Sequence, residues 1–145
     1  MASQVYNYAK QQLLNGGIDL DTDDIRMVLL STNTTADTEN DTINTVNDFT
    51  TLDEFDGAGY SRHTFTTEAV NLDDANDRAE FDAEDAALGA VSAGTRSVQG
   101  CLIIKFVTND TDNIPIAWLE FAANKTPDGS SFTVQWDAEG LIQAS

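Results

Sequence analysis

The chain has 145 residues and a mass of 15.7 kDa, which suits a single domain with a buried core. It carries 25 Asp and Glu residues against 7 Lys and Arg residues, so its formal net charge at pH 7 is −18. Such an acidic surface repels phosphate groups and therefore disfavours nucleic acids and anionic membranes as direct partners. It keeps the protein soluble and suits a basic partner surface or a saline habitat, although a solvating coat without a specific partner is the simpler interpretation.

Residues 3–15 form a predicted amphipathic helix, with Ser3 as its cap and a Gly-Gly pair at its end. Its apolar face has two possible targets, namely the protein's own sheet or a neighbouring subunit. We therefore predict a helical arm over residues 1–17 and a β core over residues 18–145. If the arm docks on a neighbour, the candidate partner-contact residues are Val5, Tyr6, Tyr8, Ala9 and Leu13.

Residues 25–31 are the first predicted strand, which is apolar on both faces except at Arg26. The aspartates before this strand alternate as in a calcium-binding loop. However, the sixth loop position is Asp24 rather than Gly, and the twelfth is Leu30 rather than Glu. A loop between helix and strand therefore explains this segment better than a metal site. The alternating aspartates are Asp19, Asp21 and Asp23.

Residues 32–47 are rich in Thr, Asn and Asp and offer only Ile43 and Val46 for burial, which predicts a long exposed loop. Residues 60–70 are typical of a strand with one face in solvent. This segment contains His63, the only histidine. A structural role is favoured for His63, because the chain has neither another histidine nor a set of cysteines to complete a metal site.

The densest acidic segment, residues 73–85, begins in a predicted turn and contains a short predicted strand over residues 78–83. Ca²⁺ favours carboxylate oxygens, but these acids lack the spacing of a known ligand set. A solvated acidic rim is therefore favoured over a cation site. Residues 86–94 consist mainly of small residues, and their pattern indicates only weak order.

Residues 97–107 and 114–121 are two apolar, β-rich runs joined by a polar loop, which predicts a pair of strands. Both faces of the first run are largely apolar, so this pair should lie in the middle of a sheet beneath a second layer. Pro115 lacks a ladder donor and fits the start of a strand or an edge position. Cys101, the single cysteine, is interpreted as a small buried residue.

A Pro-Asp-Gly turn leads into an alternating strand over residues 131–136, and residues 141–142 suggest a last short strand. Together these elements predict one domain over residues 1–145. Its fold class is mainly β, either a β-sandwich or a barrel-like sheet, with one N-terminal amphipathic helix that makes it α+β.

The sequence contains none of the common motifs for a nucleophilic serine, a phosphate-binding loop, a dinucleotide site or a zinc protease. Carboxylates are so frequent that a pair of them does not indicate a glycosidase. We therefore expect no enzyme activity, no cofactor and no bound metal. The first residues do not resemble a signal peptide, and no apolar run approaches the ~20 residues of a membrane-spanning helix.

Seven blocks of the chain together carry a resemblance to a known family, and they are residues 6–10, 13–20, 24–30, 59–62, 77–83, 132–137 and 140–142. Their motifs are a helix-to-strand junction and alternating strands, and they span nearly the whole chain. In these blocks the chain resembles small virion proteins of tailed bacteriophages.

The resemblance implies a capsid decoration (cement) protein, which binds outside a shell of major capsid protein and stabilises the head against the pressure of packaged DNA. Such proteins often act as homotrimers, so the implied partners are the major capsid protein and further copies of the chain. The implied location is the outer surface of the virion, after synthesis in the host cytoplasm. Two alternatives stay open: a tail, connector or fibre component of the virion, and a carbohydrate- or Ca²⁺-binding β-sandwich that uses Trp118 or the acids of residues 73–85.

Overall fold

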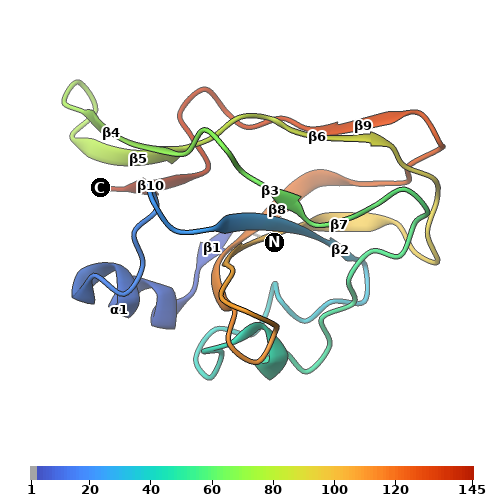
Figure 1. The fold of residues 1–145 in the computed structure, drawn as a ribbon, viewed down its shortest axis with the longest axis horizontal. Coiled ribbons are helices and arrows are strands. Elements are labelled where there is room, and N and C mark those ends of the chain that lie inside the picture. The colour runs from blue at the N-terminus through green and yellow to red at the C-terminus, as the bar shows by residue number, and fades with distance from the viewer. Residues whose placement is uncertain (1–2) are drawn as a thin grey trace.

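The computed structural model in Figure 1 describes residues 3–145 and is mainly β, as the sequence predicts. The largest sheet has five strands, and all its neighbouring strands pair antiparallel. In sheet order, these strands are β1 (Gln4–Val5), β8 (Ile114–Lys125), β7 (Val98–Lys105), β2 (Ile25–Ser31) and β3 (His63–Thr64).

Two smaller sheets lie over one face of the five-stranded sheet and form a second layer (Figure 1). The three-stranded sheet has the order β10 (Ile142–Ala144), β5 (Arg78–Asp82) and β4 (Ala69–Asp73), and the two-stranded sheet pairs β6 (Ala86–Ala90) with β9 (Ser131–Val134). The two small sheets are connected twice along the chain, by a short link from β5 to β6 and by a longer loop from β9 to β10.

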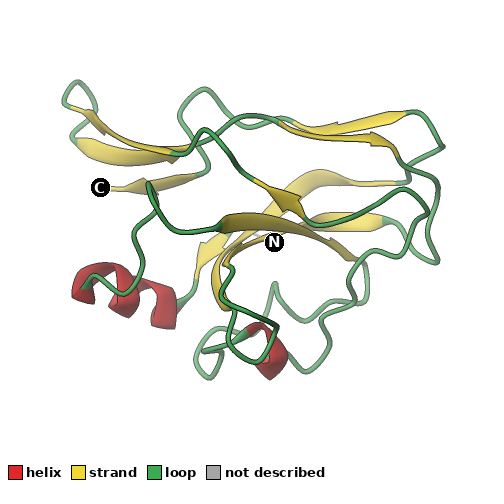
Figure 2. Cartoon of the chain, in the orientation of Figure 1, coloured by secondary structure: helices red, strands yellow, loops and turns green. Residues whose placement is uncertain are grey.

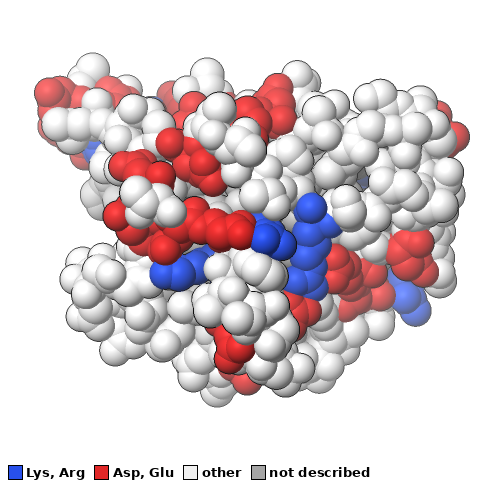
Figure 3. All heavy atoms as spheres, viewed as in Figure 1, with Lys and Arg blue, Asp and Glu red and all other residues white. Residues whose placement is uncertain are grey.

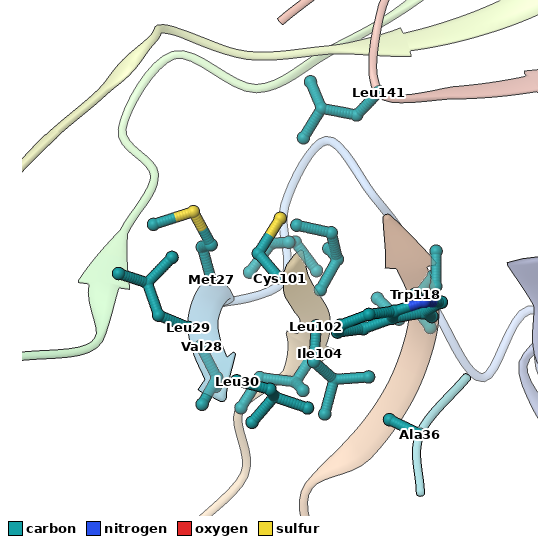
Figure 4. Packing of buried hydrophobic residues seen from close by; sticks show 14 of the residues in the cluster. Met27, Val28, Leu29, Leu30, Ala36, Cys101, Leu102, Ile104, Trp118 and Leu141 are labelled. Atoms are coloured by element: carbon teal, nitrogen blue, oxygen red, sulfur yellow. The ribbon is translucent and has the colours of Figure 1, made fainter. Parts of the chain in front are cut away.

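The predicted central strands are confirmed as β7 and β8, with β7 at the centre of the five-stranded sheet. Both faces of β7 are covered, because alternate side chains enter different layers. In Figure 4, Cys101 points towards Leu141 of the second layer, whereas Leu30 and Ile104 point to the opposite side, where Ala36 lies. All five side chains are buried. Pro115 is the second residue of β8, in agreement with its predicted position near the start of a strand.

The helix α1 (Asn7–Asn15) is the one α-helix among the described residues (Figure 2). It begins four residues later than predicted, because Gln4 and Val5 pair with β8 as an edge strand, and Ser3 therefore does not cap it. The predicted glycine stop is confirmed, since Gly16 has a φ of 72° and its N–H bonds to carbonyls of the last turn. Residues 1 and 2 of the predicted arm lie outside the described part of the chain.

The prediction of an exposed loop over residues 32–47 is wrong in part. The segment has no strand and only the start of a 3₁₀ turn, η1 (Val46–Asp48), but it packs under the five-stranded sheet. Ala36, Ile43 and Val46 are buried beneath that sheet. The Tyr6 hydroxyl donates a hydrogen bond of 2.6 Å to the Ala36 carbonyl, which ties the loop to the N-terminal segment.

Two further predictions need correction. Only the short strands β3 and β4 form around residues 60–70, and β4 extends to Asp73, where the sequence predicts a turn. Of the small residues 86–94, residues 86–90 form the strand β6 against β9, with a bulge at Gly89, whose φ is 72°, whereas residues 91–94 have no regular structure. Small side chains suit this strand, since Ala86 is fully buried.

Candidate interaction surface

The three-stranded sheet projects beyond the five-stranded sheet at one end of the molecule, where it lies opposite α1 (Figure 1). The pairing register places Val70, Phe81 and Ile142 side by side on one face of this small sheet. Leu72 and its cross-strand neighbours Ala79 and Ala144 lie on the same face. Phe81 is buried, which identifies this face as the inner one. The outer face carries the charged side chains of Asp73, Arg78 and Glu80, which form ion pairs with one another.

The inner face of the three-stranded sheet loses its cover towards the tip of the β4–β5 hairpin. The side chain of Phe81 is 2% exposed, that of Val70 is 46% exposed and that of Leu72 is 75% exposed. Ala79 and Ala144, which lie beside Leu72 on the neighbouring strands, are also not fully buried. An apolar sheet face that is left open at one end is a feature that marks contact surfaces in soluble proteins.

A groove of about 500 Å³ separates this open face from α1 and the segment that follows it. We call it the end groove. Its lining is mainly apolar, and acidic side chains lie along it. The residues that line it are Leu13, Gly16, Ile18, Asp19, Leu20, Asp21, Val70, Ala79, Glu80, Phe81, Ile142 and Ala144.

Strand β4 forms an edge of its sheet, and part of this edge is unoccupied. The Val70 N–H points away from β5, because it donates a hydrogen bond of 2.6 Å to Asp21 Oδ1. Backbone groups alternate in direction along an antiparallel strand, so those of Leu72 point to the same outer edge as those of Val70. The edge therefore presents the N–H and C=O of Leu72 beside its exposed side chain.

The charge around the end groove is negative and poorly compensated. Figure 3 shows acidic side chains gathered over this end of the molecule, and Asp19 and Asp21 are exposed beside the groove without a Lys or Arg partner among the described residues. Five of the seven Lys and Arg side chains already form ion pairs within the chain. Glu80 of the groove lining is paired with Arg78, so Asp19 and Asp21 are the acids of the lining without an ion pair among the described residues.

The five predicted partner-contact residues do not form one surface. Tyr6 and Ala9 are fully buried in the protein's own core and cannot contact a partner while the arm stays in place. Val5, Tyr8 and Leu13 are half-buried, and only Leu13 lines the end groove. The sequence interpretation missed Leu72 and Val70, although an alternating apolar pair in an acidic segment was an available signal.

His63 lies in a cluster around the carboxylate of Glu84. Its Nε2 is 3.6 Å from Glu84 Oε1 and is buried without a hydrogen bond to any of residues 3–145. Thr66 and Thr67 donate four hydrogen bonds to Glu84, with lengths between 2.7 and 3.0 Å. Partial burial alone would raise the pKa of Glu84, but these hydrogen bonds outweigh it and lower the pKa to about 2. The cluster holds the chain between β3 and β4 against the β5–β6 link.

Arg62 holds two loops together and was not singled out from the sequence. Its guanidinium forms ion pairs with Asp110, at 2.6 Å, and with Glu54, at 2.7 Å. The hydrogen bonds to Asp110 and then Glu54 raise the pKa of Arg62 further above its ordinary value. Because both carboxylates of this trio are paired with the one guanidinium, we interpret it as structural.

The other candidate sites of the sequence analysis lie in different parts of the fold. Trp118 is fully buried and cannot stack on a sugar, which removes that version of the carbohydrate-binding alternative. Cys101 is buried as predicted, and burial raises the pKa of its thiol. Over residues 3–145, no three His, Cys, Asp or Glu side chains are grouped so that they could hold a metal ion, and no helix has the length and apolarity to cross a bilayer.

We compared the chain with protein-family models, with curated proteins and with solved structures, and none of them matches it significantly.

Proposed function

We propose that this protein is a capsid decoration protein, which binds the outer surface of a lattice of major capsid protein and stabilises the phage head. The proposal starts from the resemblance of the sequence blocks to small virion proteins. In this role the protein would act together with its own copies, as a homotrimer, and would be located on the outside of the virion.

The observation that supports this function best is the uncovered apolar face at one end of the molecule. Leu72 is 75% exposed there, whereas the central strands β2 and β7 of the five-stranded sheet bury all their apolar side chains. A decoration protein needs a rigid body and a contact surface rather than reactive groups. Many copies, each with a modest contact, would stabilise one shell through multivalency.

The test is the number of copies in purified particles of a phage that encodes this chain. A decoration protein should be present at about one copy per major capsid subunit, or at one trimer per local three-fold position, and cryo-electron microscopy should place it on the shell. A few copies per virion at the tail or its connector would instead support the alternative of a tail, connector or fibre component. Absence from the particle would reject both.

A further inference from the structure

We propose that the end groove receives an extended apolar segment of a partner protein that carries Lys or Arg on either side of its apolar part, and that this segment adds as a strand to the free edge of β4. The inference rests on the proposed function in one respect, since it gives the chemistry of the shell segment that a decoration protein would bind. It concerns only the surface between β4, β10 and α1.

The edge of β4 is suited to strand addition. Leu72 presents both its N–H and its C=O to the outside, and the side chains of Val70 and Leu72 stand on the same face. Main-chain hydrogen bonds to such an edge supply affinity, and alternate side chains of the added strand supply specificity. An added strand would carry its alternate side chains into the end groove, beside Leu72 and above the buried Leu20.

The open face requires an apolar occupant. The groove wall combines half-buried or exposed aliphatic side chains with the buried Phe81, and its volume of about 500 Å³ accommodates several aliphatic side chains. Water in contact with Leu72 and Val70 would be released when such side chains fill the groove. A wholly polar segment would gain only the edge hydrogen bonds.

The surrounding charge selects a basic occupant and disfavours a second copy of this chain. Asp19 and Asp21 flank the groove, and Asp74 and Asp77 are exposed on the turn of the β4–β5 hairpin. Two copies would each bring a net charge of −18 to the contact, and most of their cations are already paired. Like charges at a contact oppose association, whereas Lys or Arg beside the aspartates favours it.

A model peptide tests these requirements on the full chain. The probe is a blocked peptide of alternating Val and Thr with two lysines at each end, and its control has glutamates in place of the lysines. We expect calorimetry to detect binding of the lysine peptide that weakens with added salt, and no binding of the glutamate peptide. Hydrogen exchange should slow at the Leu72 amide when the lysine peptide is bound.

Two pairs of variants separate the charge from the apolar face. Asp19→Asn with Asp21→Asn removes two charges but keeps the acceptor for the Val70 N–H, and it should weaken lysine-peptide binding about fivefold to tenfold. Its matched control is Asp112→Asn with Asp128→Asn, two exposed acids outside the groove lining, which should change binding less than twofold.

Leu72→Ser should weaken binding about tenfold, because it removes the most exposed apolar side chain of the groove face. Its control is Val107→Ser, because Val107 is also exposed, at 46%, but lies in the loop after β7. This substitution should leave binding unchanged. Thermal melting of each variant verifies that the fold is retained.

Equal binding of the two peptides, or equal weakening by the variants and their controls, would overturn the proposal. A stable oligomer in sedimentation that is lost in Leu72→Ser would also overturn it, because a second copy would then cover the face. These results are independent of the particle count. A protein present on the shell that does not bind the lysine peptide would retain the proposed function and lose this inference.

Discussion

The two antiparallel sheets that share the core differ in how completely they are covered. In the five-stranded sheet, Cys101 faces the second layer, Ile104 faces the loop beneath, and both are fully buried. In the three-stranded sheet, Phe81 is buried, yet Leu72, two rungs away on the same face, is 75% exposed. Apolar side chains on a sheet face thus stabilise the fold where another layer covers them, and they form a contact surface where that layer ends. The following substitutions test this difference between the two sheets.

Trp118→Ala should have the largest effect. Trp118 is fully buried under the centre of the five-stranded sheet, and the truncation leaves a large cavity. We expect the free energy of unfolding to fall by about 3–5 kcal/mol. Denaturant unfolding followed by circular dichroism measures this change. A loss below about 1 kcal/mol would contradict a closely packed central sheet.

Gly100→Ala tests the same sheet by adding an atom instead of removing a ring. A Cβ at Gly100 would contact the Leu119 carbonyl oxygen and would lie 2.7 Å from the Trp118 ring. We expect a loss of about 1–3 kcal/mol from overpacking. Calorimetric melting should show a lower transition temperature, and an unchanged transition would mean that the strands separate there easily.

Glu84→Gln tests the junction between the two layers and has a pH signature. The pKa of Glu84 is about 2 in the folded protein, against an ordinary value of 4.5, so ionised Glu84 stabilises the fold fully above pH 4.5. That contribution is lost as the pH falls towards 2. The variant should be about 1–2 kcal/mol less stable at pH 7, because the amide NH₂ group of Gln cannot accept the threonine hydrogen bonds that one of the two Glu84 oxygens receives.

Melting curves of the wild type and of Glu84→Gln should therefore converge between pH 4.5 and pH 2. A difference in stability that stays constant over this range would show that the charge of Glu84 is not responsible. The control is His63→Gln, which changes the side chain beside Glu84 but keeps the hydrogen bonds from Thr66 and Thr67 to Glu84.

Leu72→Ala should have the smallest effect on the isolated protein. The side chain is 75% exposed, so its truncation should change the free energy of unfolding by less than about 0.5 kcal/mol. This near-neutral result contrasts directly with Trp118→Ala. A loss above about 1.5 kcal/mol, with a transition that depends on protein concentration, would show that a second copy covers the face.

The sequence predicts the centre of the fold well. The strand over residues 25–31 has the same bounds as β2, and the paired runs near residues 100 and 118 are β7 and β8. These strands are predictable because a run that is apolar on both faces has few other ways to be buried. The helix stop at Gly16 is predictable for a local reason, since glycine readily adopts the positive φ that ends a helix.

The structure of the outer elements depends on tertiary contacts, which a local sequence pattern does not reveal. Tyr6 resembles a residue of an amphipathic arm, but its hydroxyl reaches Ala36 and its ring packs edge-on against Phe49. The strand β6 is built from small residues whose pattern resembles a loop, and only its pairing with β9 makes it a strand. The exposure of Leu72 depends on where the sheet beneath it ends, which is a property of the whole fold.

Asp21 sets the length of the open edge. Its carboxylate already accepts the Val70 N–H, so an added strand cannot bond to that N–H. Such a strand can pair only with the edge from Leu72 towards the hairpin turn. Cross-β growth requires every main-chain group along an edge to pair with the next molecule. We therefore expect this interrupted edge, together with the net charge of −18, to oppose the stacking of copies into fibrils.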